Sequence, residues 1–599
     1  MKLYHNSRES VYRSPFGALP CGTAVTLRLM AEGKQLSVIL RTWKDGAEYR
    51  YPMRQCGGGL FEATITLKKP GNLWYFFIVD NGHKIQYYGN ARDNLGGEGK
   101  TASCKPSSYQ INVYRKNANA PEWMRDAIVY QVLLDRFYAS KSPNPSNYVE
   151  NAGFHSSILE TPTLIVEGHE HPARDFYGGD LNGLIEKLPY LQSLGIRVVY
   201  LNPIFSAPSN HKYDTADYET IDKGFGTEEN FIALCEAAKT LGIRIILDGV
   251  FSHTGSDSRY FNRYNRFDDL GAFQSKESPY FCWYKFSHWP DKYESWWGFQ
   301  TLPEVNKTTS SFKDYIINNE DAICAHWLKA GASGWRLDVT DELPLPFLRA
   351  LRKRIKAFSQ DRALIGEVWE DGSNKVAYGV ARNYLTGDTL DSLMNYPLRD
   401  GLIEFMLFRI SASVFIRRAE ALRENYPPQF FYSMLNLLGS HDTPRILAIL
   451  AGRDDLKPPW EERRPIELSQ NEYELAKRRL VALWQFLISL PGMPCLYYGD
   501  EAGLVGMDDP FNRGAYPWGH EDVGLIHEIS EANALRNAHA VLRTGHIHLQ
   551  AVSEDIVVCE RYPVDGRDAF GKPCGDARAV FTLDRVNTVC DSQIVAEQN

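Results

Sequence analysis

Four acidic residues stand at or just after the ends of predicted β-strands: Asp248, Asp338, Glu367 and Asp442. A single aspartate in that position is most often a turn residue or a helix N-cap. Four of them, most beside Arg, His or Trp, are harder to explain as caps. Glycoside hydrolysis requires a pair of carboxyl groups, because one must protonate the leaving oxygen while the other attacks the anomeric carbon or activates water.

Neighbouring residues add to this interpretation. Arg336 lies two residues before Asp338, and side chains two apart on a strand project to the same face, so the guanidinium can hold Asp338 ionised. An acid at Glu367 has to carry its proton into the reaction, and burial beside other carboxylates favours the protonated form. The transition state resembles an oxocarbenium ion, which nearby negative charge stabilises.

These residues can meet only if the chain brings distant strands together. Between residues 122 and 530, apolar runs suited to strands alternate with helical patterns. The strand-like runs lie at 127–134, 196–201, 243–248, 334–338, 363–367, 392–396, 434–439 and 494–498. This alternation predicts a (β/α)8 TIM barrel of the α/β class, in which reacting groups collect at the C-terminal ends of the strands.

Three further units are predicted around the barrel. Residues 1–121 contain short β-rich runs separated by turns, which indicates an N-terminal β-sandwich. Residues 254–306 form too long a connection after the third strand for a plain loop, so we expect an inserted subdomain. Residues 531–599 predict a short C-terminal β domain.

The insert at 254–306 is rich in aromatic residues, including Trp283, Tyr284, Trp296, Trp297 and Phe299. Most of these rings should form the insert's own core, since a subdomain of this length has little else to bury. One or two should face the substrate, because aromatic rings give large contact areas with few rotatable bonds. Trp297 is the candidate for such a contact, because it lies close to the return to the barrel.

Composition narrows the classes of function. The 599 residues carry a net charge of −8 and no Lys/Arg-rich stripe, which argues against a nucleic-acid partner. No uninterrupted run of about 20 apolar residues predicts a membrane span, and the first residues show no pattern typical of a signal peptide. The ten cysteines include no C-x-x-C pair, so a zinc ribbon is not expected. We expect a cytoplasmic protein with reduced thiols and no membrane partner.

Four segments resemble the α-amylase family of glycoside hydrolases, and they occur in the family's order. They are 248–253, 334–338, 366–369 and 438–442, which read DGVFSH, GWRLD, GEVW and LGSHD. The resemblance covers nearly the whole chain. It implies that Asp338 is the nucleophile, Glu367 the general acid/base and Asp442 a third carboxylate that grips the sugar. It also implies substrate-binding roles for Tyr213, Asp248, His253, Arg336, His441, Asp509 and Arg513, although for Asp248 a structural role ordering Arg336 is an equal alternative.

The motifs at 202–205, 211–218, 302–306, 499–503 and 508–513 look like those of the neopullulanase, cyclomaltodextrinase and maltogenic amylase subgroup. This resemblance implies hydrolysis of α-1,4 bonds, and as an open alternative of α-1,6 bonds, in cyclodextrins, pullulan or maltodextrins. It also implies a homodimer in which the N-terminal sandwich of one chain narrows the cleft of the other. A transglycosylase of the same fold shares every catalytic residue. A non-catalytic carbohydrate-binding protein is a third alternative, against which the intact carboxylates argue.

The chain departs from the family pattern in two places, at Ser252 and at Asp341. Ser252 stands where much of the family has an asparagine that helps to bind calcium. A second set of oxygen ligands for a structural calcium would be Asn144, Asn147 and Asp180, although an ordinary polar turn explains them as well. Asp341 replaces an asparagine and would add negative charge on the acceptor side. No cofactor is required for the expected reaction.

Overall fold

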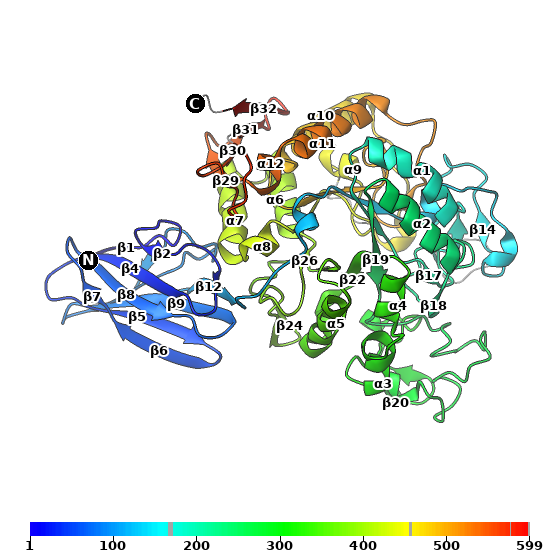
Figure 1. The fold of residues 1–599 in the computed structure, drawn as a ribbon, viewed down its shortest axis with the longest axis horizontal. Helices are drawn as coiled ribbons and strands as arrows, with labels where there is room; N and C mark the ends of the chain where they lie inside the picture. The colour runs from blue at the N-terminus through cyan, green and yellow to red at the C-terminus, as the bar shows by residue number, and fades with distance from the viewer. Residues whose placement is uncertain (166–171, 454–457, 576, 597–599) are drawn as a thin grey trace.

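The computed structural model describes residues 1–165, 172–453, 458–575 and 577–596 (Figure 1). The N-terminal sandwich occupies one end of the molecule and the barrel fills the other. The small C-terminal sheet lies beside the last helices, and the insert projects from the opposite side of the barrel in this view.

The barrel is a single sheet of eight parallel strands. In chain order they are β13 (Val129–Val132), β16 (Val198–Leu201), β19 (Arg244–Gly249), β22 (Gly334–Leu337), β23 (Ala363–Gly366), β26 (Ser392–Leu393), β27 (Leu435–Leu437) and β28 (Met493–Tyr497). A parallel bridge between Met394, just after β26, and Leu435 of β27 closes the ring. Most strand residues are buried on both faces, because helices cover the outside and side chains fill the inside. The predicted TIM barrel is confirmed.

Helices surround this ring. They are α1 (Leu181–Ser193), α2 (Glu228–Thr240), α3 (Ser310–Lys313), α4 (Ile323–Lys329), α5 (Leu345–Phe358), α6 (Tyr396–Met406), α7 (Ala412–Asn425), α8 (Pro428–Phe431), α9 (Ile446–Leu450), α10 (Gln470–Leu487), α11 (Val523–Ala538) and α12 (Ala540–Thr544). The longest, α10, begins with a capping box in which Ser469 and Glu472 satisfy each other's backbone amides. Within the described part of the chain, no helix is long and apolar enough to cross a membrane.

The N-terminal sandwich has its own hydrophobic core between two sheets. One sheet contains β1 (Lys2–Tyr4), β2 (Arg13–Ser14), β4 (Ala24–Glu32), β7 (Arg54–Gln55) and β8 (Leu60–Thr66). The other contains β3 (Leu19–Pro20), β5 (Ser37–Lys44), β6 (Ala47–Pro52), β9 (Gly71–Asp80), β10 (Ile85–Gly89), β11 (Lys100–Ala102) and β12 (Tyr109–Tyr114). Alternating burial along β4, where Val25, Leu27 and Leu29 are buried, is what a sheet with one face on a core requires.

Polar contacts tie the sandwich to the barrel. Glu424 of α7 accepts hydrogen bonds from Arg8 Nε at 3.1 Å and from Arg13 Nη1 at 2.8 Å. Gln110 of β12 donates to Ser373 Oγ at 3.0 Å, in the segment that follows Glu367. The sandwich therefore also contacts a loop that borders the candidate site.

The insert after β19 is held by an aromatic core and a short hairpin, β20 (Phe286–His288) and β21 (Lys292–Tyr293). Its buried rings are those of Tyr260, Phe261, Trp283, Tyr284 and Tyr293. Trp297 and Phe299 instead leave 74% and 56% of their surface exposed. Most rings of the insert thus form its core, as expected, and Trp297 is one of the exceptions.

The C-terminal sheet is antiparallel and contains β29 (His546–Ala551), β30 (Ile556–Tyr562), β31 (Ala577–Asp584) and β32 (Val589–Ala596). It packs on α7 and α10 of the barrel. Helix α11 runs through residue 530, the boundary expected from the sequence, and packs on α10. The sheet therefore begins only at His546, after α12.

Candidate active site

The barrel brings all four predicted carboxylates to its C-terminal end, where one arginine connects three of them. The side chain of Arg336 on β22 is completely buried. Its Nη1 lies 2.9 Å from Asp248 Oδ1 and 3.0 Å from Asp338 Oδ1. Its Nη2 lies 2.8 Å from Glu367 Oε2. Residues from β19, β22 and the end of β23, far apart in sequence, therefore share one positive charge.

Glu367 is fixed by two further donors. The backbone amide of Val339 donates to Glu367 Oε2 at 2.7 Å, and the Trp369 indole donates to Oε1 at 3.0 Å. Val339 has φ 39°, which is a strained backbone conformation for a β-branched residue. That turn directs its amide at Glu367. The Trp369 ring stacks on Tyr396 with centroids 3.8 Å apart, which holds the indole in place.

Asp338 keeps one oxygen available. Its Oδ2 is buried and accepts no hydrogen bond from any residue that the structure describes. An oxygen atom in that state is costly unless a ligand or substrate uses it. Burial raises the pKa of Asp338 well above its usual range, Arg336 opposes this rise, and the charges on Glu367 and Asp248 add to it.

The four carboxylates outnumber the two guanidinium groups that pair with them, Arg336 and Arg513. Such a cluster holds at least one proton near neutral pH, because like charges this close cannot all ionise. Burial raises the pKa of Asp442 to about 7, and the charge on Glu367 is the next largest cause. One proton shared among ionised neighbours is the state in which an acid and a nucleophile can work together.

Tyr213 and His441 connect the outer part of the cluster. The Tyr213 hydroxyl lies 2.9 Å from Asp248 Oδ2 and 2.7 Å from His441 Nε2, and the two rings are stacked. His441 Nε2 also lies 3.0 Å from Asp442 Oδ2. Burial lowers the pKa of His441 well below its usual value, and Arg513 lowers it further, so the ring is neutral.

The remaining predicted residues lie at different depths. Arg513 Nη2 approaches Asp442 Oδ1 to 3.7 Å, and Asp509 pairs with Arg513 Nη1 at 3.0 Å, so Asp509 reaches the cluster only through Arg513. His253 Nε2 lies 3.2 Å from the carbonyl oxygen of Tyr213, and its ring lies 5.3 Å from that of Trp296. Burial lowers the pKa of His253 to about 4.

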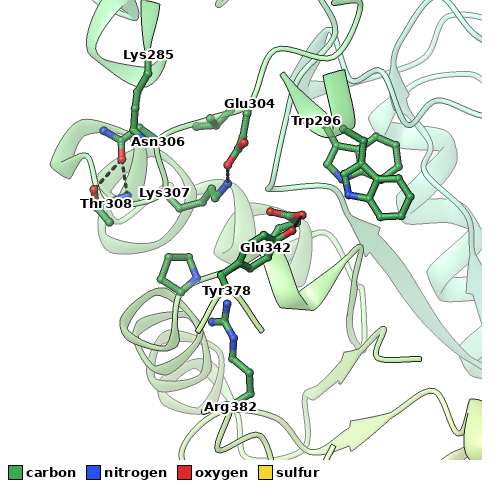
Figure 2. Close-up of a pocket in the computed structure, with 12 residues that line it drawn as sticks. Lys285, Trp296, Glu304, Asn306, Lys307, Thr308, Glu342, Tyr378 and Arg382 are labelled. Atoms are coloured by element: carbon green, nitrogen blue, oxygen red, sulfur yellow. Dashed lines mark hydrogen bonds and ion pairs between the residues drawn. The ribbon is translucent and has the colours of Figure 1, made fainter. Parts of the chain in front are cut away.

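A pocket of about 520 Å³ opens between the insert and the segment that follows Asp338 (Figure 2). Trp296 and Trp297, with ring centroids 5.1 Å apart, form one wall. The ion pair between Glu304 and Lys307 forms another, and Tyr378 contacts Glu342 at the centre of the view. The aromatic stack and the mixed charges provide both the flat surfaces and the hydrogen-bonding groups that a sugar needs.

Asp341 is held by polar contacts beside the pocket. Its carboxylate accepts a hydrogen bond from Tyr384 at 2.5 Å and lies 3.2 Å from Lys375 Nζ, an ammonium group that Glu370 shares. Glu342, the next residue, is the one that lines the pocket. Asp341 therefore ties two loops together, and the added negative charge on the acceptor side stays a prediction.

The three proposed calcium ligands do meet, around a small pocket of about 40 Å³ that is also lined by Lys141 and Lys223. Asp180 is the one carboxylate of the set, and its Oδ1 caps α1 by accepting from Gly183 N at 2.7 Å. Its Oδ2 accepts from Ser140 Oγ at 2.8 Å. Calcium prefers several oxygen ligands with free lone pairs and net negative charge. In this arrangement the residues form a helix cap and a polar turn, and calcium binding by them stays a prediction.

Sequence reasoning missed several residues that hold the site together. Trp369 lies inside one of the quoted motifs, two residues after Glu367, and that spacing was the available signal. Tyr200 donates to Asp248 Oδ2 at 2.6 Å, and Asn202 donates to the Tyr213 hydroxyl at 2.9 Å. Both belong to the second strand region, where an apolar run followed by Asn-Pro resembles a motif of the subgroup and carries no charged residue that would indicate a site.

The fold and the cluster together define a class of protein: a (β/α)8 barrel with the carboxylate arrangement that glycoside hydrolysis requires. Comparison with known families is more specific. The family model described as "Alpha amylase, catalytic domain" matches residues 131–544. The chain belongs to the α-amylase family, and the family predicted from its motifs is confirmed.

Individual relatives agree with the predicted subgroup. An amylopullulanase of Thermoanaerobacterium saccharolyticum is 36% identical over 99% of this chain and 49% of its own length. A cyclomaltodextrinase of Geobacillus thermopakistaniensis is 32% identical over 86% of this chain and 80% of its own length. The ligand-free structure of cyclic alpha-maltosyl-(1→6)-maltose hydrolase from Arthrobacter globiformis has a TM-score of 0.64 at 30% identity, covering 80% of this chain and 97% of that one. The chain spans about half or less of the amylopullulanases that it matches.

Proposed function

We propose that this chain is a retaining glycoside hydrolase that cleaves α-glucosidic bonds by double displacement. The observation that carries the proposal is the arrangement of Asp338 and Glu367 around Arg336. In it, the buried Asp338 Oδ2 accepts no hydrogen bond from a described residue. One guanidinium holds both reacting groups in place. No cofactor enters the reaction, since the two carboxyl groups supply the nucleophile and the proton.

In the first step, Asp338 Oδ2 attacks the anomeric carbon and forms a covalent glucosyl ester. The bond from that carbon to the glycosidic oxygen breaks, and Glu367 gives its proton to the departing oxygen. In the second step, the Glu367 carboxylate takes a proton from water, whose oxygen attacks the same carbon and releases Asp338. Asp442, His441 and Tyr213 hold the sugar through both steps.

Hydrolysis should release products with the α-configuration, because two successive inversions at one carbon restore the starting stereochemistry. Proton NMR of freshly formed products, recorded before mutarotation, distinguishes the anomers directly. Initial formation of β-anomers would contradict the assignment of Asp338 as a nucleophile and would favour direct attack by water.

The substrate class follows from the relatives, which are named amylopullulanase, cyclomaltodextrinase and neopullulanase. We propose cyclodextrins, pullulan or maltodextrins, with α-1,4 bonds as the main target and α-1,6 bonds as a second one. A turnover panel of β-cyclodextrin, pullulan, soluble starch and maltotriose, with resolved products, tests both the ranking and the bond type. Absence of turnover on all four would contradict the proposed class.

A transglycosylase is the second candidate, because the pocket next to the cluster could hold an acceptor sugar in place of water. Its aromatic wall and the polar groups of Glu304, Lys307 and Glu342 support this alternative. The two activities share the glucosyl–enzyme intermediate. Product analysis with excess acceptor sugar separates them, because only transfer yields products longer than the substrate.

Trp297→Ala should raise the Michaelis constant for long glucans more than it slows an activated aryl glucoside. The ring is largely exposed at the rim of the pocket, so its removal should cost binding surface and leave the melting temperature almost unchanged. Trp283→Ala is the matched control, since Trp283 is buried in the core of the insert. That variant should melt lower and affect all substrates alike. The same behaviour in Trp297→Ala would show that this ring also serves packing.

We propose a homodimer in which the partner covers the acceptor side of the cleft. The hairpin of β24 (Val376–Ala377) and β25 (Val380–Ala381) exposes Val376, Tyr378 and Val380 beside the pocket. Exposed apolar side chains grouped at a binding site favour a protein contact.

Sedimentation at micromolar concentration should therefore give a dimer. The double substitution Val376→Glu and Val380→Glu should shift it to a monomer, because a charged side chain in the contact loses its hydration. Val595→Glu, at an exposed position on the C-terminal sheet, is the control and should remain dimeric. A monomeric wild-type chain would contradict the proposal.

A further inference from the structure

A buried glutamine on the first barrel strand contacts the site from behind. Gln131 of β13 leaves 1% of its surface exposed. Its side-chain nitrogen, Nε2, lies 2.8 Å from His441 Nδ1 and 3.1 Å from Asn202 Oδ1. Within the described part of the chain, Gln131 makes no hydrogen bond to Asp338 or Glu367, so a role for Gln131 must pass through its two partners.

The positions of the hydrogen atoms around it can be worked out from Asp248. Arg336 pairs with both oxygens of Asp248, at 2.9 and 3.0 Å, so this carboxylate can act only as an acceptor. The Tyr213 hydroxyl, 2.9 Å from Asp248 Oδ2, must therefore give Asp248 its one hydrogen. Every other polar neighbour of that hydroxyl has to donate to it.

Two groups remain beside the Tyr213 hydroxyl: Asn202 Nδ2 at 2.9 Å and His441 Nε2 at 2.7 Å. Asn202 must present its amide nitrogen there, which leaves its Oδ1 as an acceptor on the other side. His441 must carry a hydrogen on Nε2, and because the ring is neutral its Nδ1 is then an acceptor. When Asp442 is ionised, its carboxylate, 3.0 Å from the same Nε2, favours the same tautomer.

Gln131 completes this network. Both atoms that face it, Asn202 Oδ1 and His441 Nδ1, are acceptors, because Asn202 Nδ2 and His441 Nε2 donate to Tyr213. An amide nitrogen has two hydrogens and can satisfy both at once, while an oxygen atom in that place would oppose two lone pairs. The orientation of the Gln131 amide is thus set by its partners, and the tautomer of His441 is set by Gln131 in turn.

We propose that Gln131 is a positioning residue, which keeps His441 Nδ1 free of a proton so that the one hydrogen of the neutral ring stays on Nε2, the nitrogen that faces Tyr213, Asp442 and the bound sugar. Only the contact between His441 and the sugar rests on the proposed function. The tautomer itself is a property of the unliganded protein. A histidine in the wrong tautomer presents a lone pair where a donor is needed, and it repels the Asp442 carboxylate.

The groups that face the His441 ring are known from the structure. Tyr213, Asp442 and Gln131 contact its ring nitrogens, while the charges of Arg513, Arg336 and His211 act on the ring and lower its pKa further than burial alone does. Arg513 Nε donates to the His441 carbonyl oxygen at 3.1 Å, so it holds the backbone of this residue and leaves the ring nitrogens to their other partners. Among the described residues, Gln131 is the one that the structure places in hydrogen-bond contact with Nδ1.

Nitrogen NMR of the full chain labelled with 15N-histidine tests the proposal, since the two ring nitrogens shift by tens of ppm with protonation. His441→Gln identifies the signals of His441. In the wild type, we expect Nε2 protonated and Nδ1 unprotonated at neutral pH. A proton on Nδ1 of the wild-type ring would overturn the proposal outright.

Two variants change the partner of Nδ1. Gln131→Glu places a carboxylate, which only accepts, against it, so Nδ1 should gain a proton. Gln131→Met keeps the shape and removes both donors, so the group that opposes a proton on Nδ1 is lost and Nδ1 should become protonated in a measurable fraction of the molecules. We expect kcat/KM to fall by roughly 10–100-fold in each, as for other residues that orient a working histidine. An unprotonated Nδ1 in Gln131→Glu, or undiminished kcat/KM in both variants, would overturn the role of Gln131.

Gln429→Met is the matched control. Gln429 on α8 is also buried, and its amide donates to the Ala118 carbonyl oxygen at 3.1 Å in the segment that leads from the sandwich to the barrel. This variant should leave the His441 signals and kcat/KM unchanged.

If the wild type shows the expected tautomer but hydrolyses no α-glucan, the proposed function fails while the tautomer assignment stands. The two failures are therefore distinguishable.

Discussion

Asp338→Asn and Glu367→Gln should each remove nearly all turnover while the fold stays intact. Both substitutions keep the shape of the side chain and remove the charge or the proton that the reaction uses. General acid/base assistance alone contributes about 10²–10⁴-fold, and loss of the nucleophile should cost at least as much. Single-turnover kinetics on a maltodextrin measures both losses.

An activated aryl glucoside separates the two roles. Its leaving group departs without a proton, so Glu367→Gln should form the glucosyl–enzyme intermediate and accumulate it. Asp338→Asn should form none, because the attacking oxygen is gone. Circular dichroism and melting curves are the controls for folding. A large residual activity in either variant, with the fold intact, would show that the residue has been given the wrong role.

The order and number of barrel strands could be predicted from the sequence because each strand is an apolar run bounded by turn residues. The ends were harder to place. The run at 392–396 was predicted as a strand, but β26 ends at Leu393 and α6 begins at Tyr396. Pro397 in the first turn of α6 fits a helix start, where its missing amide hydrogen costs nothing. A short strand that leads directly into a helix shares its last residues with that helix, which periodicity cannot resolve.

The candidate site was predictable where charged residues stand out against apolar strands, as Asp338, Glu367 and Arg336 do. Gln131 was hidden for the opposite reason: it is a single polar residue inside the run Ala127 to Leu134, which was taken as a uniformly buried strand. Its partners His441 and Asn202 are distant in sequence. Only the closed barrel shows that a glutamine on the first strand meets a histidine that follows the seventh.

The charge of Asp442 should lower the stability of the folded chain near neutral pH, so Asp442→Asn should be more stable than the wild type while losing activity. Burial, with Glu367 as the next cause, raises the pKa of Asp442 to about 7 in the folded state, from 3.8. The folded protein therefore binds this proton more tightly than the unfolded chain. Protonation of Asp442 therefore favours folding. This favourable contribution is complete below about pH 4 and is lost as the pH rises to about 7.

An asparagine has no proton to lose, so the variant should gain on the wild type across this window. A shift of about three pKa units corresponds to at most about 4 kcal/mol. The Asp442 side chain keeps 31% of its surface exposed, and solvent screening should reduce the gain to roughly 1–2 kcal/mol. The contact to Arg513 at 3.7 Å is long, so its loss should offset little of this. Turnover should fall by roughly 10²–10³-fold, as when a preorganised group at the transition state is removed.

Melting curves of both proteins between pH 4 and 7.5 measure the difference, which should be near zero at the acid end and grow toward neutral pH. Asp509→Asn is the control, because it removes an acidic partner of the same Arg513 outside the buried cluster. It should show no gain that grows with pH. If Asp442→Asn melts below the wild type at pH 7, the carboxylate stabilises the fold, and the cluster does not carry the excess negative charge that the catalytic proposal uses.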